Sequence, residues 1–255
     1  MAAVKLLKQG WGGIKAHVLL DILRLVPKFC LVTGHEDGDQ TFMSDYPYYK
    51  DCMYLFDRVY TKPESLYRIH QKEARFIVIC KSDISVETIE TFQYDGADKN
   101  VMADRKIRFV GSKSQKGYPE SLRQVLYYSR NINETISFLT NDTVLPANII
   151  AEIYRYRWYI EVFFKWMKQH LNIQTFYGQS TSAVSIHVYV AIITICIVAL
   201  VANDHKVNAL NHYELSRVLS SAITHRYWLP DLIRQATENI PESDTFEQPS
   251  LFDAI

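Results

Sequence analysis

Four residues with reactive or charged side chains recur at helical spacing in the second half of the chain. Tyr154, Arg157, Glu161 and Lys168 lie in residues 146–171, whose pattern predicts a long helix. At about 100° per residue their side chains fall within a sector of roughly 60°, with Lys165 near it. Carboxylates bind hard divalent cations and guanidinium groups bind phosphates, so this face could support phosphate chemistry. A solvated polar face held by ion pairs is the alternative.

A second carboxylate closes an apolar run earlier in the chain. Residues 52–57 read CMYLFD, which predicts a buried strand that ends at Asp57. A carboxylate at a strand end can ligate a metal, or it can simply begin a turn.

These segments resemble the bacterial insertion-sequence transposases of the DDE type that carry a Tyr-Arg-Glu-Lys signature. The run YRYRWYIEVFFKWMKQHLNI, residues 154–173, matches the signature with gaps of two, three and six residues. FYGQSTSAV follows it, with Ser182 where the family has Asn. Upstream, GGIKAH, FDRVY and FLTND resemble family blocks in the family's order, although Val59 replaces the usual Gly.

The resemblance implies an RNase H-like core that binds two divalent cations, Mg²⁺ or in its place Mn²⁺. Asp57 matches the second catalytic aspartate and Glu161 the glutamate, so both are expected to be catalytic metal ligands. Paired metals activate the attacking oxygen and stabilise the leaving one. Tyr154, Arg157, Lys165 and Lys168 would then lie against the DNA backbone. The implied activity is cut-and-paste transposition on double-stranded DNA, with a homodimer formed on the DNA.

The first catalytic aspartate of the family has no counterpart in this sequence. None of the eleven residues before Gly12 is Asp or Glu, and Asp21, Asp37 and Asp39 do not match the family position. We therefore expect the first core strand to be missing and the chain alone to be inactive. The alternative function is a catalytically dead remnant that still binds DNA.

The elements predict an α/β fold: an RNase H-like core, an antiparallel β-rich insertion and a helical C-terminal part. Strands are expected at residues 14–21, 28–33, 52–57 and 75–81, with helices at 42–49 and 62–71. The expected parts are 1–81 as the first half of the core, 82–141 as the insertion and 142–205 as the rest of the core. Residues 206–240 would form C-terminal helices, and 241–255 a disordered acidic tail.

Composition is compatible with a cytoplasmic protein that associates with the nucleoid. The 28 basic and 28 acidic residues cancel, which counts mildly against DNA binding, but a basic stretch at residues 105–123 offsets this. The four cysteines form no C-x-x-C pair and fit free thiols in a reducing compartment. Residues 188–202 are apolar except for Thr194, short of the roughly 20 residues that span a membrane. We expect a core helix there and no membrane; a small membrane protein is a distant alternative.

The acidic tail contains a short motif of its own. Gln248, Leu251 and Phe252 lie in QPSLF, which resembles the peptide by which some bacterial DNA-associated proteins dock on the sliding clamp. An extended segment would place the two apolar side chains in a pocket. The alternative is that these side chains pack back on the domain.

Overall fold

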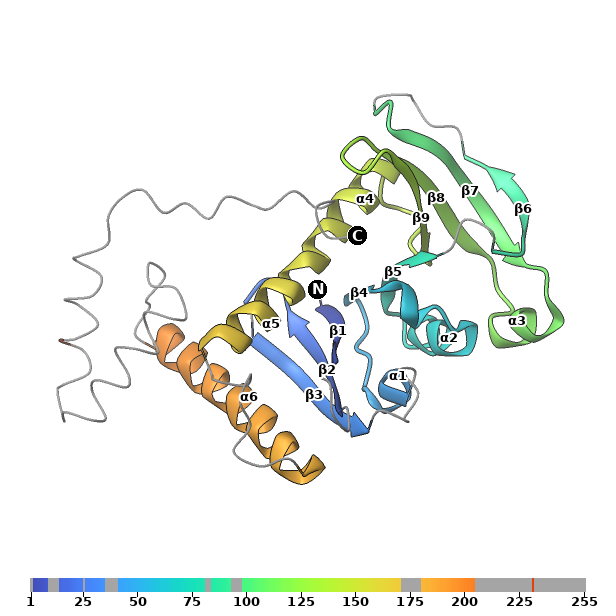
Figure 1. Cartoon of the computed structure of the whole chain (residues 1–255). Coiled ribbons are helices and arrows are strands. Elements are labelled where there is room, and N and C mark those ends of the chain that lie inside the picture. Colours follow the sequence, from blue (N-terminus) through green and yellow to red (C-terminus); the bar gives the residue numbers. More distant parts are fainter. Residues whose placement is uncertain are drawn as a thin grey trace. The chain divides into compact units, whose positions relative to one another are not determined.

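The computed structural model of the chain describes residues 2–8, 14–24, 26–34, 41–80, 84–92, 98–170, 180–204 and 231. It divides into two compact units, and the first holds the sheet and both predicted catalytic carboxylates (Figure 1). That unit comprises Met1–Phe163 and Ser250–Ile255, and the second comprises Phe164–Pro249.

Five strands make the core part of the sheet, in the order β3-β2-β1-β4-β5. They are β1 (Ala2–Lys8), β2 (Ile14–Asp21), β3 (Val26–Gly34), β4 (Met53–Phe56) and β5 (Arg75–Cys80). The first three form an antiparallel meander, whereas β4 runs parallel to both β1 and β5. A three-stranded meander continued by parallel strands is the topology expected for the RNase H-like core.

The expectation that the first core strand is missing is wrong for this structure. β1 occupies the central place, paired with β2 on one side and β4 on the other, with Val4 opposite Phe56. Strand pairing needs only backbone N–H and C=O groups, so a run without any carboxylate can fill the position. The segment AAVKLLK lacks the family's aspartate, so the resemblance does not identify it as the first core strand, although it can pair as one.

Short helices join the core strands; the two predicted at 42–49 and 62–71 are present, the first ending early at Asp45, and a 3₁₀ turn was not predicted. They are α1 (Thr41–Asp45), the 3₁₀ turn η1 (Arg58–Tyr60) and α2 (Pro63–Gln71). Pro63 opens α2, where its missing N–H costs no hydrogen bond. Leu66 and Ile69 of α2 are buried with Phe56 and Tyr60 in a core rich in aromatic rings.

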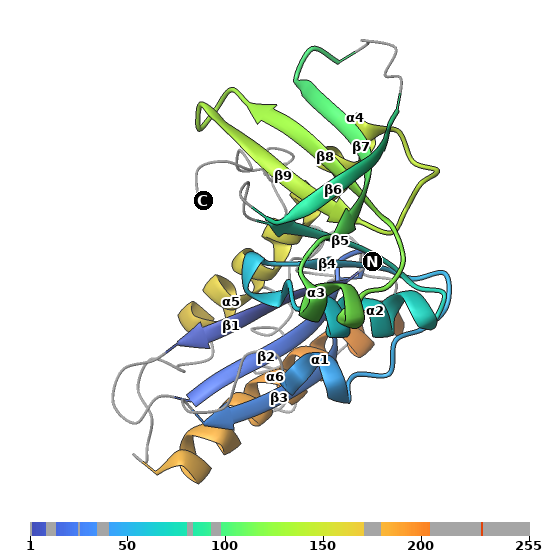
Figure 2. The ribbon, with the colours of Figure 1, turned by 90° about the vertical axis from the view of Figure 1, so that its right-hand side faces the viewer.

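The β-rich insertion extends the core sheet instead of forming a separate one (Figure 2). It contains β6 (Val86–Thr91), β7 (Val101–Phe109), α3 (Ser112–Gly117), β8 (Leu122–Ser129) and β9 (Glu134–Thr140). All its pairings are antiparallel, and β9 also pairs with β5, with Ile77 opposite Thr140. The result is one nine-stranded sheet in the order β3-β2-β1-β4-β5-β9-β8-β7-β6.

One residue of the basic stretch is not available to DNA. Arg123 is only 5% exposed, and its guanidinium donates to both carboxylate oxygens of Asp104 at 2.6 and 2.8 Å. The same group donates to the carbonyl of Leu145 at 2.6 Å. Arg123 therefore joins β8 to β7 and to the loop after β9.

The predicted long helix over residues 146–171 is broken by a tighter turn. The structure has α4 (Ala147–Arg155), the 3₁₀ turn η2 (Tyr156–Trp158) and α5 (Tyr159–His170). A 3₁₀ turn has about 3.0 residues per turn instead of 3.6, so it rotates the side chains that follow relative to those before it. Arg157 lies within this turn and is buried.

The second unit contains α6 (Thr181–Asp204), which is apolar on all sides. Ser182–Val201 is 20 residues long with a mean hydropathy of 2.6, long and apolar enough to cross a membrane, with 28% of it buried. The expectation that this run is too short to span a membrane is therefore wrong, because the apolar helix is longer than residues 188–202. A core helix of a soluble protein meets the same criterion, and that interpretation stays a prediction.

The remaining predicted features fall outside the described residues. The helices expected over 206–240 lie there except for Asp231, as does the whole acidic tail with Gln248, Leu251 and Phe252.

Candidate active site

Asp57 stands immediately after β4, where its carboxylate caps the 3₁₀ turn η1. Oδ1 accepts a hydrogen bond from the backbone N–H of Arg58 at 2.6 Å. This bond fixes the direction of the carboxylate and leaves Oδ2 for another partner. The side chain is 39% exposed, so ions and solvent can reach it.

Glu161 lies in the first turn of α5, and its side chain is 18% exposed. Its Oε1 accepts a hydrogen bond from Arg157 Nη1 at 3.1 Å, across one helical turn.

Arg157 brings the two carboxylates together. The same Nη1 atom lies 3.1 Å from Glu161 Oε1 and 3.8 Å from Asp57 Oδ2. Because both distances start at one nitrogen, the two oxygens are separated by no more than 6.9 Å, the sum of 3.1 and 3.8 Å. This is within the roughly 8 Å expected if both carboxylates ligate one metal centre with ions about 4 Å apart.

Tyr154 differs from its expected place at a DNA surface. Its ring is buried, with 1% exposure, and its hydroxyl donates to the carbonyl of Phe56 at 3.0 Å. Burial raises the pKa of Tyr154 well above its ordinary value, so the hydroxyl stays a protonated donor. Tyr154 therefore ties α4 to the strand end that carries Asp57, and in this structure its hydroxyl is engaged inside the protein.

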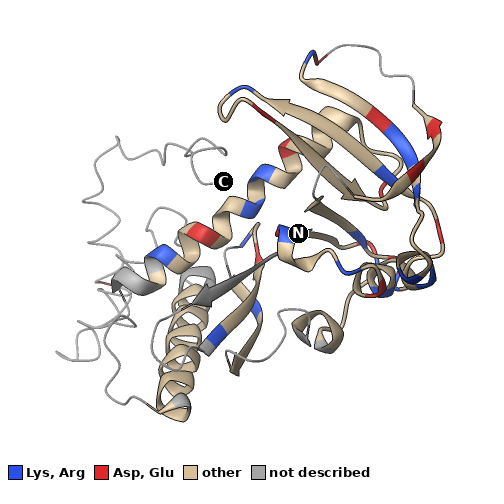
Figure 3. Ribbon diagram, turned by 45° about the vertical axis from the view of Figure 1, so that its right-hand side comes forward, with Lys and Arg blue, Asp and Glu red and all other residues tan. Residues whose placement is uncertain are grey.

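The two predicted lysines follow Glu161 on α5. Lys165 is exposed, whereas the side chain of Lys168 lies outside the described part of the chain. Both belong to the second unit. Both basic and acidic residues occur along the ribbon of α4 and α5 (Figure 3).

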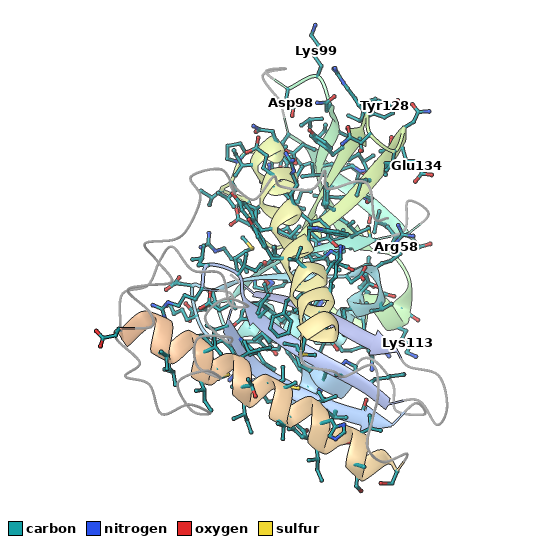
Figure 4. All side chains as sticks on the ribbon, turned by 60° about the vertical axis from the view of Figure 1, so that its left-hand side comes forward. Arg58, Asp98, Lys99, Lys113, Tyr128 and Glu134 are labelled. Atoms are coloured by element: carbon teal, nitrogen blue, oxygen red, sulfur yellow. The ribbon has the colours of Figure 1, made fainter. Side chains whose placement is uncertain are left out.

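Arg58 is a cation that the sequence reasoning did not single out. It follows Asp57 directly, and its side chain is exposed (Figure 4). The only sequence signal is its position within FDRVY, beside the aspartate.

Asp142, another unpredicted polar residue, is buried behind the strand ends. Its Oδ1 accepts from the N–H groups of Val144 and Leu145 at 2.9 and 2.8 Å. Its Oδ2 accepts from Arg75 at 3.1 Å. Burial opposes ionisation, but these donors outweigh it and hold the pKa of Asp142 below its usual value. The Asp in FLTND was a visible signal of a turn of this kind.

Within the described part of the chain, no third carboxylate joins Asp57 and Glu161. β1 contains neither Asp nor Glu. Val4 pairs with Phe56, so Lys5 is the β1 residue that follows beside Asp57. Among the described residues no group of three or more His, Cys, Asp or Glu side chains is suited to hold a metal. Two carboxylates suit one Mg²⁺ ion, which proteins often hold through one or two carboxylates while it keeps several waters.

Comparison with known proteins places this chain in a family. The sequence model of the family described as "Transposase DDE domain" matches residues 7–197. A putative transposase, y4zB, of Sinorhizobium fredii strain NGR234 is 29% identical over 198 residues, which are 76% of this chain and 55% of the relative. The probable transposase for insertion sequence element IS5377 of Geobacillus stearothermophilus is 30% identical over 138 residues, 54% of this chain and 36% of the relative. The chain spans about half the length or less of these curated relatives.

A solved structure shows a similar fold. The chain resembles the piggyBac transposase in a cryo-EM structure of its synaptic complex with hairpin DNA, with a TM-score of 0.52. The similarity covers 92% of this chain and 52% of the piggyBac chain at 11% sequence identity. It supports the RNase H-like interpretation of the core.

Proposed function

The chain belongs to the transposase DDE domain family, and on that premise we propose that it is the catalytic part of an insertion-sequence transposase that cuts and joins double-stranded DNA. The observation that carries the proposal is the meeting of Asp57 and Glu161 around Arg157. Two carboxylates from a strand end and a helix start supply the oxygen ligands that divalent cations prefer.

In this proposal Asp57 and Glu161 hold Mg²⁺, or Mn²⁺ in its place. When bound, the metal would supply Lewis-acid activation of the attacking and leaving oxygens of a phosphodiester. The chain's own residues do the positioning: Tyr154 holds the strand end before Asp57, and the Arg58 amide orients the carboxylate.

Three basic residues near Asp57 or Glu161 in the sequence would contact the DNA backbone. Arg58 and Lys165 are exposed, and Lys168 is one helical turn beyond Lys165 in the sequence. Each phosphate contact releases counterions, so affinity should fall with salt. Lys165→Ala and Lys168→Ala are each expected to weaken binding of a short duplex and to lower the salt slope by about one. Unchanged binding of both variants across a salt series would mean that these lysines are only solvated surface.

For this chain alone we favour DNA binding without strand transfer. The supporting observation is that β1 carries no carboxylate beside β4. With the two carboxylates that the described residues bring together, one cation has ligands and a second has too few. The alternative function, a catalytically dead DNA-binding remnant, therefore has specific support in this sequence.

Two measurements test the proposal: Mn²⁺ binding to the protein, and nicking of and strand transfer into supercoiled plasmid. Mn²⁺ bound to the protein, measured by paramagnetic resonance, should be lost in Asp57→Asn and in Glu161→Gln. Glu152→Gln is the matched control, because Glu152 is an exposed carboxylate on α4. Plasmid strand transfer by the wild-type chain would overturn the binding-only interpretation, and Mn²⁺ binding indifferent to both variants would overturn the ligand assignment.

The remaining proposals concern where the protein acts and which partners it binds. We propose that the protein acts in the cytoplasm on nucleoid DNA, as a homodimer on DNA. Docking of Gln248, Leu251 and Phe252 on a sliding clamp stays a prediction from sequence. A titration of a peptide covering residues 244–255 against purified clamp tests it, with Leu251→Ala and Phe252→Ala combined as the control.

A further inference from the structure

Arg157 occupies the place between the two carboxylates that a metal ligated by both would need. Its side chain is 9% exposed, and Nη1 is within 4 Å of Asp57 and of Glu161. A guanidinium stays charged in proteins, so it cannot make room by losing a proton. A divalent cation bound to both carboxylates would lie close to this fixed positive charge and would be repelled by it.

In the same position the guanidinium also lies over an aromatic ring that stabilises its charge. Its central carbon lies 5.7 Å from the centre of the Tyr154 ring, a distance at which a cation is attracted to an aromatic face. Planar guanidinium groups stack on rings and also bind phosphate oxygens in a fork. A DNA phosphate can therefore replace the carboxylates as the partner of this guanidinium.

We propose that Arg157 is an exchangeable counter-ion, which closes the metal site in the free protein and opens it when a DNA phosphate takes the guanidinium. Metal and DNA then bind with positive coupling, and each raises the affinity for the other by the same factor. The proposal rests on the proposed function, since it takes Asp57 and Glu161 as the metal ligands and DNA as the partner. It adds the order of events: the site stays poor in metal until DNA arrives.

A fixed structural ion pair predicts something different. If Arg157 only holds α5 to the end of β4, its removal would lower stability and would not raise metal affinity. The two roles are therefore distinguished by the sign of the change in metal affinity.

The experiment is a Mn²⁺ titration followed by paramagnetic resonance, with and without a short DNA duplex of arbitrary sequence. The proteins are wild type, Arg157→Gln and Arg157→Lys, each checked for folding by circular dichroism. The duplex should raise the Mn²⁺ affinity of wild type by about tenfold, a typical size for coupling between sites. Arg157→Gln should bind Mn²⁺ about tenfold more tightly than wild type without DNA, and the duplex should change it little. Arg157→Lys keeps a cation and should restore weak binding that responds to DNA.

Two results would separate failure of this proposal from failure of the proposed function. Equal Mn²⁺ affinity of wild type and Arg157→Gln, with Asp57→Asn still abolishing binding, would overturn the counter-ion and leave the metal site intact. Mn²⁺ binding that ignores Asp57→Asn and Glu161→Gln would overturn the metal site itself.

A measurement on the wild-type protein covers the case in which Arg157→Gln does not fold. The side-chain Nε–H signal of Arg157, assigned by its disappearance in Arg157→Lys, should move as Mg²⁺ saturates the protein and move again with duplex. Saturation with Mg²⁺ that leaves this signal in place would overturn the proposal.

Discussion

The hydroxyl of Tyr154 donates a hydrogen bond of 3.0 Å to the carbonyl of Phe56, a residue 98 positions earlier in the chain. Phe56 ends β4 directly before Asp57, and Tyr154 lies in the last turns of α4, before Arg157 and Glu161. One buried bond therefore connects the two segments that supply the carboxylates. The Tyr of the signature supports the site from inside the protein.

Tyr154→Phe removes only this hydroxyl and leaves the Phe56 carbonyl buried without its donor. An unsatisfied buried polar group costs about 1 to 3 kcal/mol, so the free energy of unfolding should fall by that amount in a urea titration. Tyr156→Phe is the matched control, since Tyr156 is 43% exposed, and surface changes stay within about 0.5 kcal/mol. Equal stability of both variants would show that the bond is not maintained in solution.

The buried pair of Arg123 and Asp104 should be among the most sensitive positions of the sheet. Removing one member of a buried ion pair leaves an unpaired charge and costs about 3 to 5 kcal/mol. Arg123→Met should therefore unfold at much lower urea, and Asp104→Leu added to it should recover part of the loss. Lys50→Met is the control, because Lys50 and Glu73 pair in solvent with side chains 63% and 69% exposed. No measurable change is expected there.

Asp142 should make the fold sensitive to acid. Its folded-state pKa is lowered, so it contributes stability that is fully present above the unfolded pKa of about 3.9 and is lost as pH falls through the folded pKa. Urea unfolding of wild type and Asp142→Asn should differ most at neutral pH, and the difference should shrink below about pH 4. A difference that stays constant down to acid pH would contradict the assignment.

Cys30 should resist alkylation in the folded protein. Burial raises the pKa of its thiol to about 12, so at pH 8 only about one molecule in ten thousand carries the reactive thiolate. Iodoacetamide labelling of the Cys30 peptide, followed by mass spectrometry, should be roughly a thousandfold slower in native protein than in urea, where the pKa returns toward 8.5. Comparable rates in both states would show that β3 opens readily.

The core strands and helices were predictable where one local signal decides the structure. Apolar runs predicted β4 and β5, and Pro63 predicted the start of α2. Asp57 and Glu161 could be paired only through the family resemblance, because nothing local connects positions so far apart. β1 was missed because its central place depends on pairing with β2 and β4, which no local pattern in AAVKLLK reveals.

The spacing of Tyr154, Arg157 and Glu161 correctly indicated neighbours, because Arg157 contacts both the Tyr154 ring and Glu161 despite the 3₁₀ turn η2. The pattern could not reveal that this face is turned toward the protein. Tyr154 turns into the core and Arg157 turns to the carboxylates. The four-residue spacing of Arg157 and Glu161 did signal an ion pair, but Asp57 as its third member needs the fold.

The order of strands in the sheet also sets the order in which the chain can fold. The strands β1, β2 and β3 pair across short sequence separations. The pairing of β1 with β4, with Ala2 opposite Tyr54, and that of β5 with β9, with Ile77 opposite Thr140, connect segments farther apart in the sequence. Longer loops cost more chain entropy to close and slow folding. The contact between Tyr154 and Phe56 spans the longest of these separations. We therefore expect the two carboxylates to come together late in refolding, after much of the sheet has paired.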